Sequence, residues 1–169
     1  MHILSAENSF RRGLASLSHG DPTGASDHFQ AAILTEVRHG VKRPQMRYLS
    51  YYGLSRALAF GATPQSIQAC ETAVRRDFFN PDLLLNLGRV YLLAGKTTKA
   101  LAAFERGLGL ASSHKGLRAE LRKLDRRAPP PLGIVSRSHP LNKMLGKLRC
   151  SLRARVPKWI GATRDADPS

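Results

Sequence analysis

The side chains that most often carry out chemistry are scattered along this sequence. No pair of histidines has the spacing of metal ligands; the six are His2, His19, His28, His39, His114 and His139. The acidic residues do not cluster either, apart from Asp165 and Asp167, so no carboxylate pair for acid–base catalysis is visible. We therefore expect no catalytic residue, no metal site and no cofactor, and a protein that is not an enzyme and has no small-molecule substrate.

Two further features could suggest chemistry, and both have simpler interpretations. Cys70 and Cys150 lie eighty residues apart in segments of different character, so they form neither a metal knuckle nor a disulfide framework. The stretch AGKTTKA, residues 94–100, is similar to the end of a phosphate-binding loop. It lacks the upstream glycine and the preceding strand, however, and is expected to be a turn between helices. Cys70 is expected to pack as a small apolar residue.

The charge of the chain is unevenly distributed. The sequence holds 27 Lys and Arg against 12 Asp and Glu. Residues 114–169 contain 14 basic and 4 acidic residues, a net charge of +10, and residues 1–113 carry a net charge of only +5. A nearly neutral body with a strongly basic C-terminal part predicts an anionic partner for that part.

No stretch of the sequence reaches the roughly 18 consecutive apolar residues that a membrane-spanning helix needs. The best candidate, the leucine-rich run from Leu83, is interrupted by Asn86 and Arg89 and ends at Gly95. The first residues lack the basic head and long apolar run of a signal peptide. These observations predict a cytoplasmic protein, with a peripheral position at the inner membrane face as an additional expectation.

The leucine-rich run predicts two helices and not one. Asn80 followed by Pro81 is typical of a helix start, and Gly95 is typical of a helix end. Thr97 or Thr98 is expected to cap a second helix, on which apolar side chains recur at helical spacing. The two helices would form an antiparallel hairpin with a very short loop.

The hairpin pattern occurs three times. Residues 87–108 align without a gap on residues 12–33, and the matched pairs are Gly88 on Gly13, Gly95 on Gly20, Ala100 on Ala25, Phe104 on Phe29 and Gly107 on Ala32. Residues 51–74 fit with one extra residue before their turn, and Cys70 replaces the aromatic residue. The spacing from Ala73 to Gly107 is 34 residues, and the spacing from Ala32 to Ala73 includes a seven-residue insertion.

This pattern resembles the tetratricopeptide repeat (TPR), a helix hairpin of 34 residues with small, aromatic and glycine positions. The third unit matches best, at Leu84, Leu87, Gly88, Tyr91, Gly95, Ala100 and Phe104. The first unit departs from the pattern at Ser9 and Arg12, where large apolar residues are usual. The resemblance implies an all-α fold, a short right-handed solenoid of three degenerate repeats.

The expected organisation has four parts. A repeat domain covers residues 4–127, with units at about 6–39, 46–79 and 80–113 and a capping helix at 114–127. Four prolines and a glycine make residues 128–140 a linker. Residues 141–160 have the pattern of a basic amphipathic helix, and residues 161–169 that of a disordered end.

The resemblance also implies a partner site, because the first helices of such units line a concave groove. When the three units are placed on that geometry, the residues expected to face the groove are apolar, polar and arginine side chains: Phe10, Arg11, Leu14, Arg47, Tyr51, Leu54, Leu85, Asn86 and Arg89. Such a lining suits a peptide or helix of another protein that carries apolar and acidic residues. The alternative is that Leu14, Leu54 and Leu85 only contact the capping segment or the tail.

The basic tail is a second candidate surface. Its expected binding residues are Lys143, Lys147, Arg149, Arg153, Arg155, Lys158 and Trp159. They suit an anionic membrane surface, with the tryptophan at the interface, or the phosphates of nucleic acid. A third interpretation is that the leucine stripe of this helix folds back on the repeats. The sequence thus predicts an adaptor or assembly factor that binds protein, with a membrane or nucleic-acid binder as the alternative.

Overall fold

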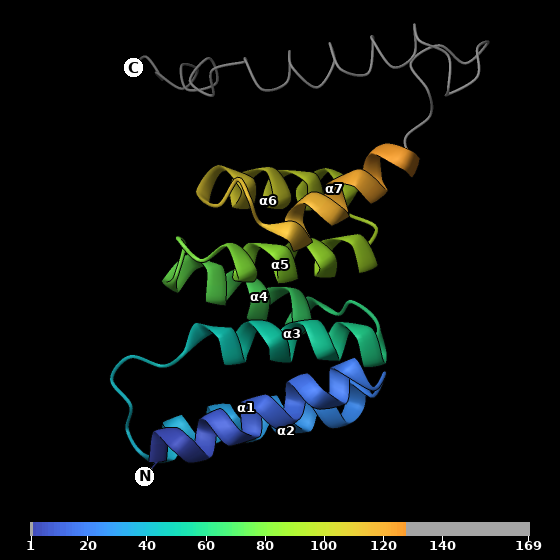
Figure 1. The fold of residues 1–169 in the computed structure, drawn as a ribbon. Coiled ribbons are helices and arrows are strands. Elements are labelled where there is room, and N and C mark those ends of the chain that lie inside the picture. The colour runs from blue at the N-terminus through green and yellow to red at the C-terminus, as the bar shows by residue number, and fades with distance from the viewer. Residues whose placement is uncertain (1, 128–169) are drawn as a thin grey trace, which may run out of the picture. The chain divides into compact units, whose positions relative to one another are not determined.

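A computed structural model describes residues 2–127 of the chain, and within this range it contains helices and no strand. Seven helices are seen there (Figure 1): α1 (His2–Ser18), α2 (Pro22–Arg38), α3 (Met46–Phe60), α4 (Pro64–Arg76), α5 (Pro81–Leu93), α6 (Thr97–Leu110) and α7 (Lys115–Arg127). The expected all-α class is therefore confirmed. The predicted linker at 128–140, helix at 141–160 and end at 161–169 lie outside the described residues.

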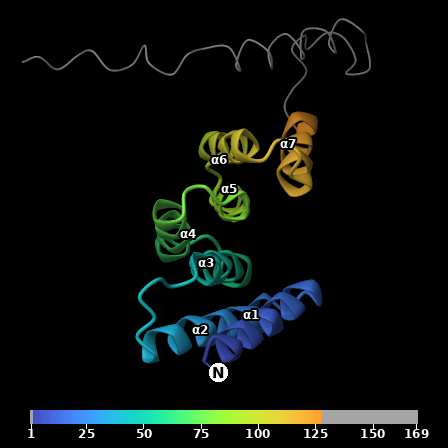
Figure 2. The same ribbon diagram turned by 60° about the vertical axis from the view of Figure 1, so that its left-hand side comes forward.

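Consecutive helices pair into three hairpins, α1 with α2, α3 with α4 and α5 with α6. The hairpins then stack, because α3 packs on α2, and α5 packs on both α3 and α4. The stacking order follows the chain in Figures 1 and 2. This is the helical-repeat arrangement that the sequence predicts, with α7 following the third hairpin.

A glycine in a left-handed conformation ends the first helix of each hairpin. The φ angles are 77° at Gly20, 84° at Gly61 and 70° at Gly95. A side chain at these positions would be strained, so glycine allows the chain to reverse within three residues. The three matched glycines of the sequence repeat are thus explained by one backbone requirement.

Side-chain caps begin three of the helices, in each case directly before a proline. Asp21 accepts a hydrogen bond from a backbone N–H of α2, Thr63 from one of α4 and Asn80 from one of α5. The predicted cap at Thr97 or Thr98 is wrong. The helix α6 already begins at Thr97, and Lys96 at the N-cap makes no side-chain capping bond.

The two helices of a hairpin cross at a second glycine. A Cβ atom on Gly13 of α1 would lie 2.5 Å from Cε1 of Phe29 on α2, closer than real Cβ contacts allow. A Cβ atom on Gly88 of α5 would overlap the ring of Phe104 on α6 in the same way. Each aromatic ring, fully buried, occupies the space that a side chain on the partner helix would need.

The second hairpin keeps the same contact with a smaller residue. A Cβ atom on Gly53 would lie 2.7 Å from Sγ of Cys70 and 2.8 Å from the backbone oxygen of Ser66. Cys70 therefore stands where the other units have phenylalanine. The contact between Gly53 and Cys70 therefore aligns the second hairpin with the other two. Its one extra residue lies between Gly53 and the turn at Gly61.

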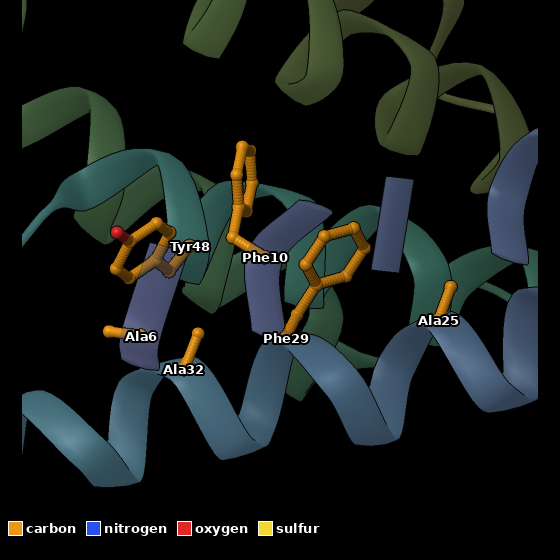
Figure 3. Close-up of a cluster of buried hydrophobic side chains, with 6 residues drawn as sticks. All are labelled: Ala6, Phe10, Ala25, Phe29, Ala32 and Tyr48. Carbon is orange, nitrogen blue, oxygen red and sulfur yellow. The ribbon is translucent and has the colours of Figure 1, made fainter. Parts of the chain in front are cut away.

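An aromatic cluster joins the first two hairpins (Figure 3). Phe10 of α1 lies between Phe29 of α2 and Tyr48 of α3, with ring centroids 5.4 Å and 5.0 Å away. Tyr51 of α3 packs edge-on against Phe10 at 5.4 Å. Because three helices contribute rings to one cluster, burial of these rings fixes how the second hairpin sits on the first.

The departures of the first unit have a physical reason in the stack. Leu84 and Leu87 are buried in α5, which has a preceding hairpin to pack against. At the matching positions of α1, Ser9 is half-buried and Arg12 is exposed. No described helix stacks on that face of α1, so these polar side chains remain in contact with solvent there.

The close approach of two helices at a glycine predicts that two glycine-to-alanine substitutions affect the free energy of unfolding differently. Gly88→Ala should lower the free energy of unfolding by about 1–3 kcal/mol, because the ring of Phe104 must move. Gly109→Ala on α6 is the matched control, since a Cβ atom there meets nothing within 4 Å. It should be neutral or stabilising by about 0.5–1 kcal/mol. Urea unfolding measures both values, and equal effects of the two substitutions would contradict the crossing.

Candidate functional site

The first helices of the three units contact one another in the order of the chain. Helices α3 and α5 pack together, and Phe10 and Glu7 of α1 contact Tyr48 and Arg47 of α3. We call the solvent-facing side chains of α1, α3 and α5 the first-helix surface. All nine residues predicted to line the groove belong to these helices.

Five of the nine predicted residues reach solvent. The side chain of Arg11 is 74% exposed, Arg47 and Arg89 are partly exposed, and Leu14 and Tyr51 are half-buried. The other four, Phe10, Leu54, Leu85 and Asn86, are buried. These four side chains stabilise the helical array and are not accessible to a partner. They are therefore not part of the candidate site.

Two of these four buried residues have neighbours far away in the sequence. Asn86 donates a hydrogen bond from Nδ2 to Oγ of Ser50, at 3.2 Å. Leu85 lies against Gly116 at the start of α7, where a Cβ atom would come within 2.8 Å of Cδ2 of Leu85. The capping helix thus covers part of α5, in agreement with the alternative reading for Leu85.

The arginines of the surface are paired with carboxylates of the same chain. Arg47 donates from Nη2 to Oε2 of Glu7 at 2.6 Å, and the Tyr48 hydroxyl donates to the same oxygen at 3.1 Å. Arg11 is 3.6 Å from the other oxygen of Glu7. Arg47 also lies over the ring of Phe10, 4.9 Å from its centroid. Glu7 is therefore the centre of the network that joins α1 to α3.

A second network joins α5 to α7. Arg89 donates from Nε to Oε1 of Glu120 at 3.0 Å, and Nζ of Lys123 is 3.4 Å from the same oxygen. His114 accepts a hydrogen bond from the backbone N–H of Leu117 on Nδ1, and its Nε2 donates to Asp82 at 2.9 Å. A carboxylate from a partner must therefore compete with Glu120 for Arg89.

Tyr51 occupies the middle of the first-helix surface. Its burial raises the pKa of its hydroxyl, and the charge of Asp82 acts in the same direction. The neighbouring Arg89, Asn86 and Arg47 act in the opposite direction. The hydroxyl consequently stays protonated at neutral pH and can both donate and accept a hydrogen bond.

The sequence did not predict the ion pairs that Glu7 and Glu120 form with arginines of this surface. One signal was present, because Glu7 and Arg47 stand at matching positions of consecutive units, six residues before Gly13 and Gly53. Opposite charges at one position of neighbouring first helices favour such a pair. Glu120 has no comparable signal, since α7 departs from the repeat pattern.

Three further findings on the described part of the chain concern metal ligands, membrane crossing and the thiol of Cys70. No group of three or more His, Cys, Asp or Glu that could hold a metal ion occurs in residues 2–127. None of the helices seen in this range is long and apolar enough to cross a membrane. Cys70 is fully buried, and its Sγ donates to the backbone oxygen of Ser50 at 3.3 Å.

Cys70 should be unreactive in the folded protein. Burial raises the pKa of its thiol to about 12. The thiolate fraction at pH 8 is then about one in ten thousand, and labelling should be about a thousandfold slower than for an exposed cysteine. A thiol reagent added to the Cys150→Ser variant measures the rate, with the urea-unfolded chain as the control. Equally fast labelling of folded and unfolded chains would contradict the buried position.

Comparison with known proteins bears on the fold. No family model matches the sequence, and neither does any curated protein. The structure of the Arabidopsis OM64 TPR domain is similar, with a TM-score of 0.60 and 17% sequence identity over 76% of this chain and 100% of that one. The structure of PcrH in complex with the chaperone binding region of PopB is similar too, with a TM-score of 0.54 and 18% identity over 73% of this chain and 94% of that one. The described part of the chain therefore has the fold of a TPR domain.

Proposed function

We propose that this protein is a non-catalytic adaptor or assembly factor that binds a segment of another protein on its first-helix surface. The observation that carries the proposal is a repeated exposed leucine. Leu58 near the end of α3 and Leu93 at the end of α5 are 47% and 48% exposed. They stand at matching positions, five residues after Gly53 and Gly88. Repeated apolar side chains that face water on adjacent helices favour a binding role.

The charges of the surface support a partner segment with apolar anchors and acidic residues. Arg11 is largely exposed and its distance to Glu7 is long, so it is the arginine most available to a partner. Arg47 and Arg89 are held by Glu7 and Glu120 at shorter distances. In this proposal apolar contacts supply most of the affinity, and the arginines select the partner and its orientation.

The structure of another protein with this fold supports the proposed binding of a partner segment. PcrH, with 18% identity to this chain, has been solved in complex with the chaperone binding region of PopB. A fold of this kind can therefore hold a segment of a partner protein.

The leucine pair provides the direct test. Leu58→Asp combined with Leu93→Asp should reduce capture of a partner protein from lysate at least tenfold, at a salt concentration of about 0.5 M that screens weak ionic contacts. Leu34→Asp is the matched control, because Leu34 is an exposed apolar residue of α2, a second helix. Capture is quantified by mass spectrometry. Capture that survives the leucine substitutions, or that the control abolishes equally, would refute the proposal.

We also propose a second, independent activity for the C-terminal part, based on its charge. Residues 114–169 carry a net charge of +10, and the predicted binding residues there lie outside the described residues: Lys143, Lys147, Arg149, Arg153, Arg155, Lys158 and Trp159. Clustered basic residues attract anionic surfaces, either lipid headgroups or nucleic-acid phosphates.

Truncation after Arg127 tests the activity of the tail. The full chain should bind a duplex DNA fragment without sequence preference, and the affinity should fall steeply with salt. The shortened chain should lose most of that binding while it keeps its captured protein partner. Unchanged DNA binding would count against the tail, and so would an insoluble shortened chain, because the tail would then be a structural cover.

A further inference from the structure

The loops between consecutive units form one edge of the repeat array. They are residues 39–45 between α2 and α3, 77–80 between α4 and α5, and 111–114 between α6 and α7. In Figure 1 these loops lie toward the same side of the stack, on the left of the view. We call the three loops, with the helix ends beside them, the inter-unit edge.

Each part of this edge exposes large apolar side chains. Phe78 and Phe79 are 47% and 69% exposed, and their ring centroids are only 4.1 Å apart. Val37 precedes the first loop with 67% exposure, and Leu110 precedes the third with 40%. Exposed apolar side chains thus occur at or beside each of the three loops, and the phenylalanine pair is the largest group of them.

The same edge is strongly basic. Eight of its basic side chains are exposed: Arg38, Lys42, Arg43, Arg75, Arg76, Arg106, Lys115 and Arg118. The nearby acidic residues are mostly engaged. Glu36 is buried and accepts hydrogen bonds from the backbone N–H of Gln45, and Asp77 accepts one from Asn80. Two exposed acidic side chains lie beside this cluster, Glu105 on α6 and Asp82 at the start of α5, and Asp82 is in contact with His114. The edge therefore complements an anionic partner.

We propose that the inter-unit edge docks on an anionic lipid surface, with Phe78 and Phe79 inserted at the level of the headgroups. Exposed aromatic rings flanked by arginines are the combination that interfacial binding requires, because the rings bury apolar area and the cations meet the negative headgroups. This surface is separate from the first-helix surface, so the inference goes beyond the proposed function and does not depend on it.

The spacing of the apolar points favours lipid over a protein. Val37 lies at the end of α2, the phenylalanine pair in the loop between α4 and α5, and Leu110 at the end of α6, and basic side chains separate them along the chain. A protein interface needs a contiguous, closely packed apolar centre. A fluid lipid interface has no such requirement and accepts isolated apolar side chains at separate points.

The two contributions differ in their response to salt. Attraction between arginines and headgroups weakens as salt is added, while insertion of the rings does not. Binding that persists at high salt comes from inserted apolar side chains, and Trp159 of the C-terminal part belongs to these as well. The share of that binding which substitution of Phe78 and Phe79 removes therefore reports on the edge.

The experiment measures binding of the full chain to vesicles of phosphatidylcholine with about 30% phosphatidylserine, at salt concentrations of about 0.1 M and 0.5 M. The double variant Phe78→Ser/Phe79→Ser should lower the partition coefficient at the higher salt at least tenfold. The matched control is Leu58→Ser/Leu93→Ser, which removes two apolar side chains of similar exposure from the first-helix surface. The control should bind vesicles as well as the wild-type chain does.

Insertion can also be observed in a variant that keeps an aromatic ring. Trp159 is the single tryptophan of the sequence, so Phe79→Trp in a Trp159→Phe background reports from the edge alone. Its fluorescence should shift to shorter wavelength on anionic vesicles and stay unchanged on pure phosphatidylcholine. An unshifted spectrum on anionic vesicles, equal high-salt binding of the serine variant, or complete loss of wild-type binding at high salt would each overturn the proposal.

Discussion

Close crossing of two helices at a glycine is the contact on which the rest of this structure depends. In the first and third hairpins the ring of Phe29 or Phe104 fills the space beside Gly13 or Gly88, and in the second the thiol of Cys70 lies beside Gly53. The contact sets the separation of the two helices in each hairpin. Because the hairpins share it, their outer faces match and can stack as repeats.

Stacking in turn produces two surfaces with different chemistry. The first helices carry exposed leucines and arginines, and the arginines are held in place by Glu7 and Glu120 from neighbouring helices. The loops between units carry exposed phenylalanines with basic neighbours and few free carboxylates. The surface proposed to bind protein and the edge proposed to dock on anionic lipid therefore have no named residue in common.

The sequence predicted the fold in detail because the relevant signals are local. The cap at Asn80, the turn glycines and the pairing of small with aromatic residues all depend on neighbours within one unit, and the structure bears them out. The site was less predictable because its partners are distant. Asn86 is hydrogen-bonded to Ser50, 36 residues earlier, and Arg89 is paired with Glu120, 31 residues later. Leu85 is covered by a helix that departs from the repeat pattern, so its burial left no periodic signal.

A double-mutant cycle on Gly88 and Phe104 tests the central contact most directly. The free energy of unfolding is measured for the wild-type chain, for Gly88→Ala, for Phe104→Ala and for the double variant. If the ring and the glycine share one space, the added methyl group should be tolerated once the ring is gone. The coupling energy should then exceed about 1 kcal/mol. Additive effects, within about 0.5 kcal/mol, would show that the two positions do not restrict each other and would contradict this account.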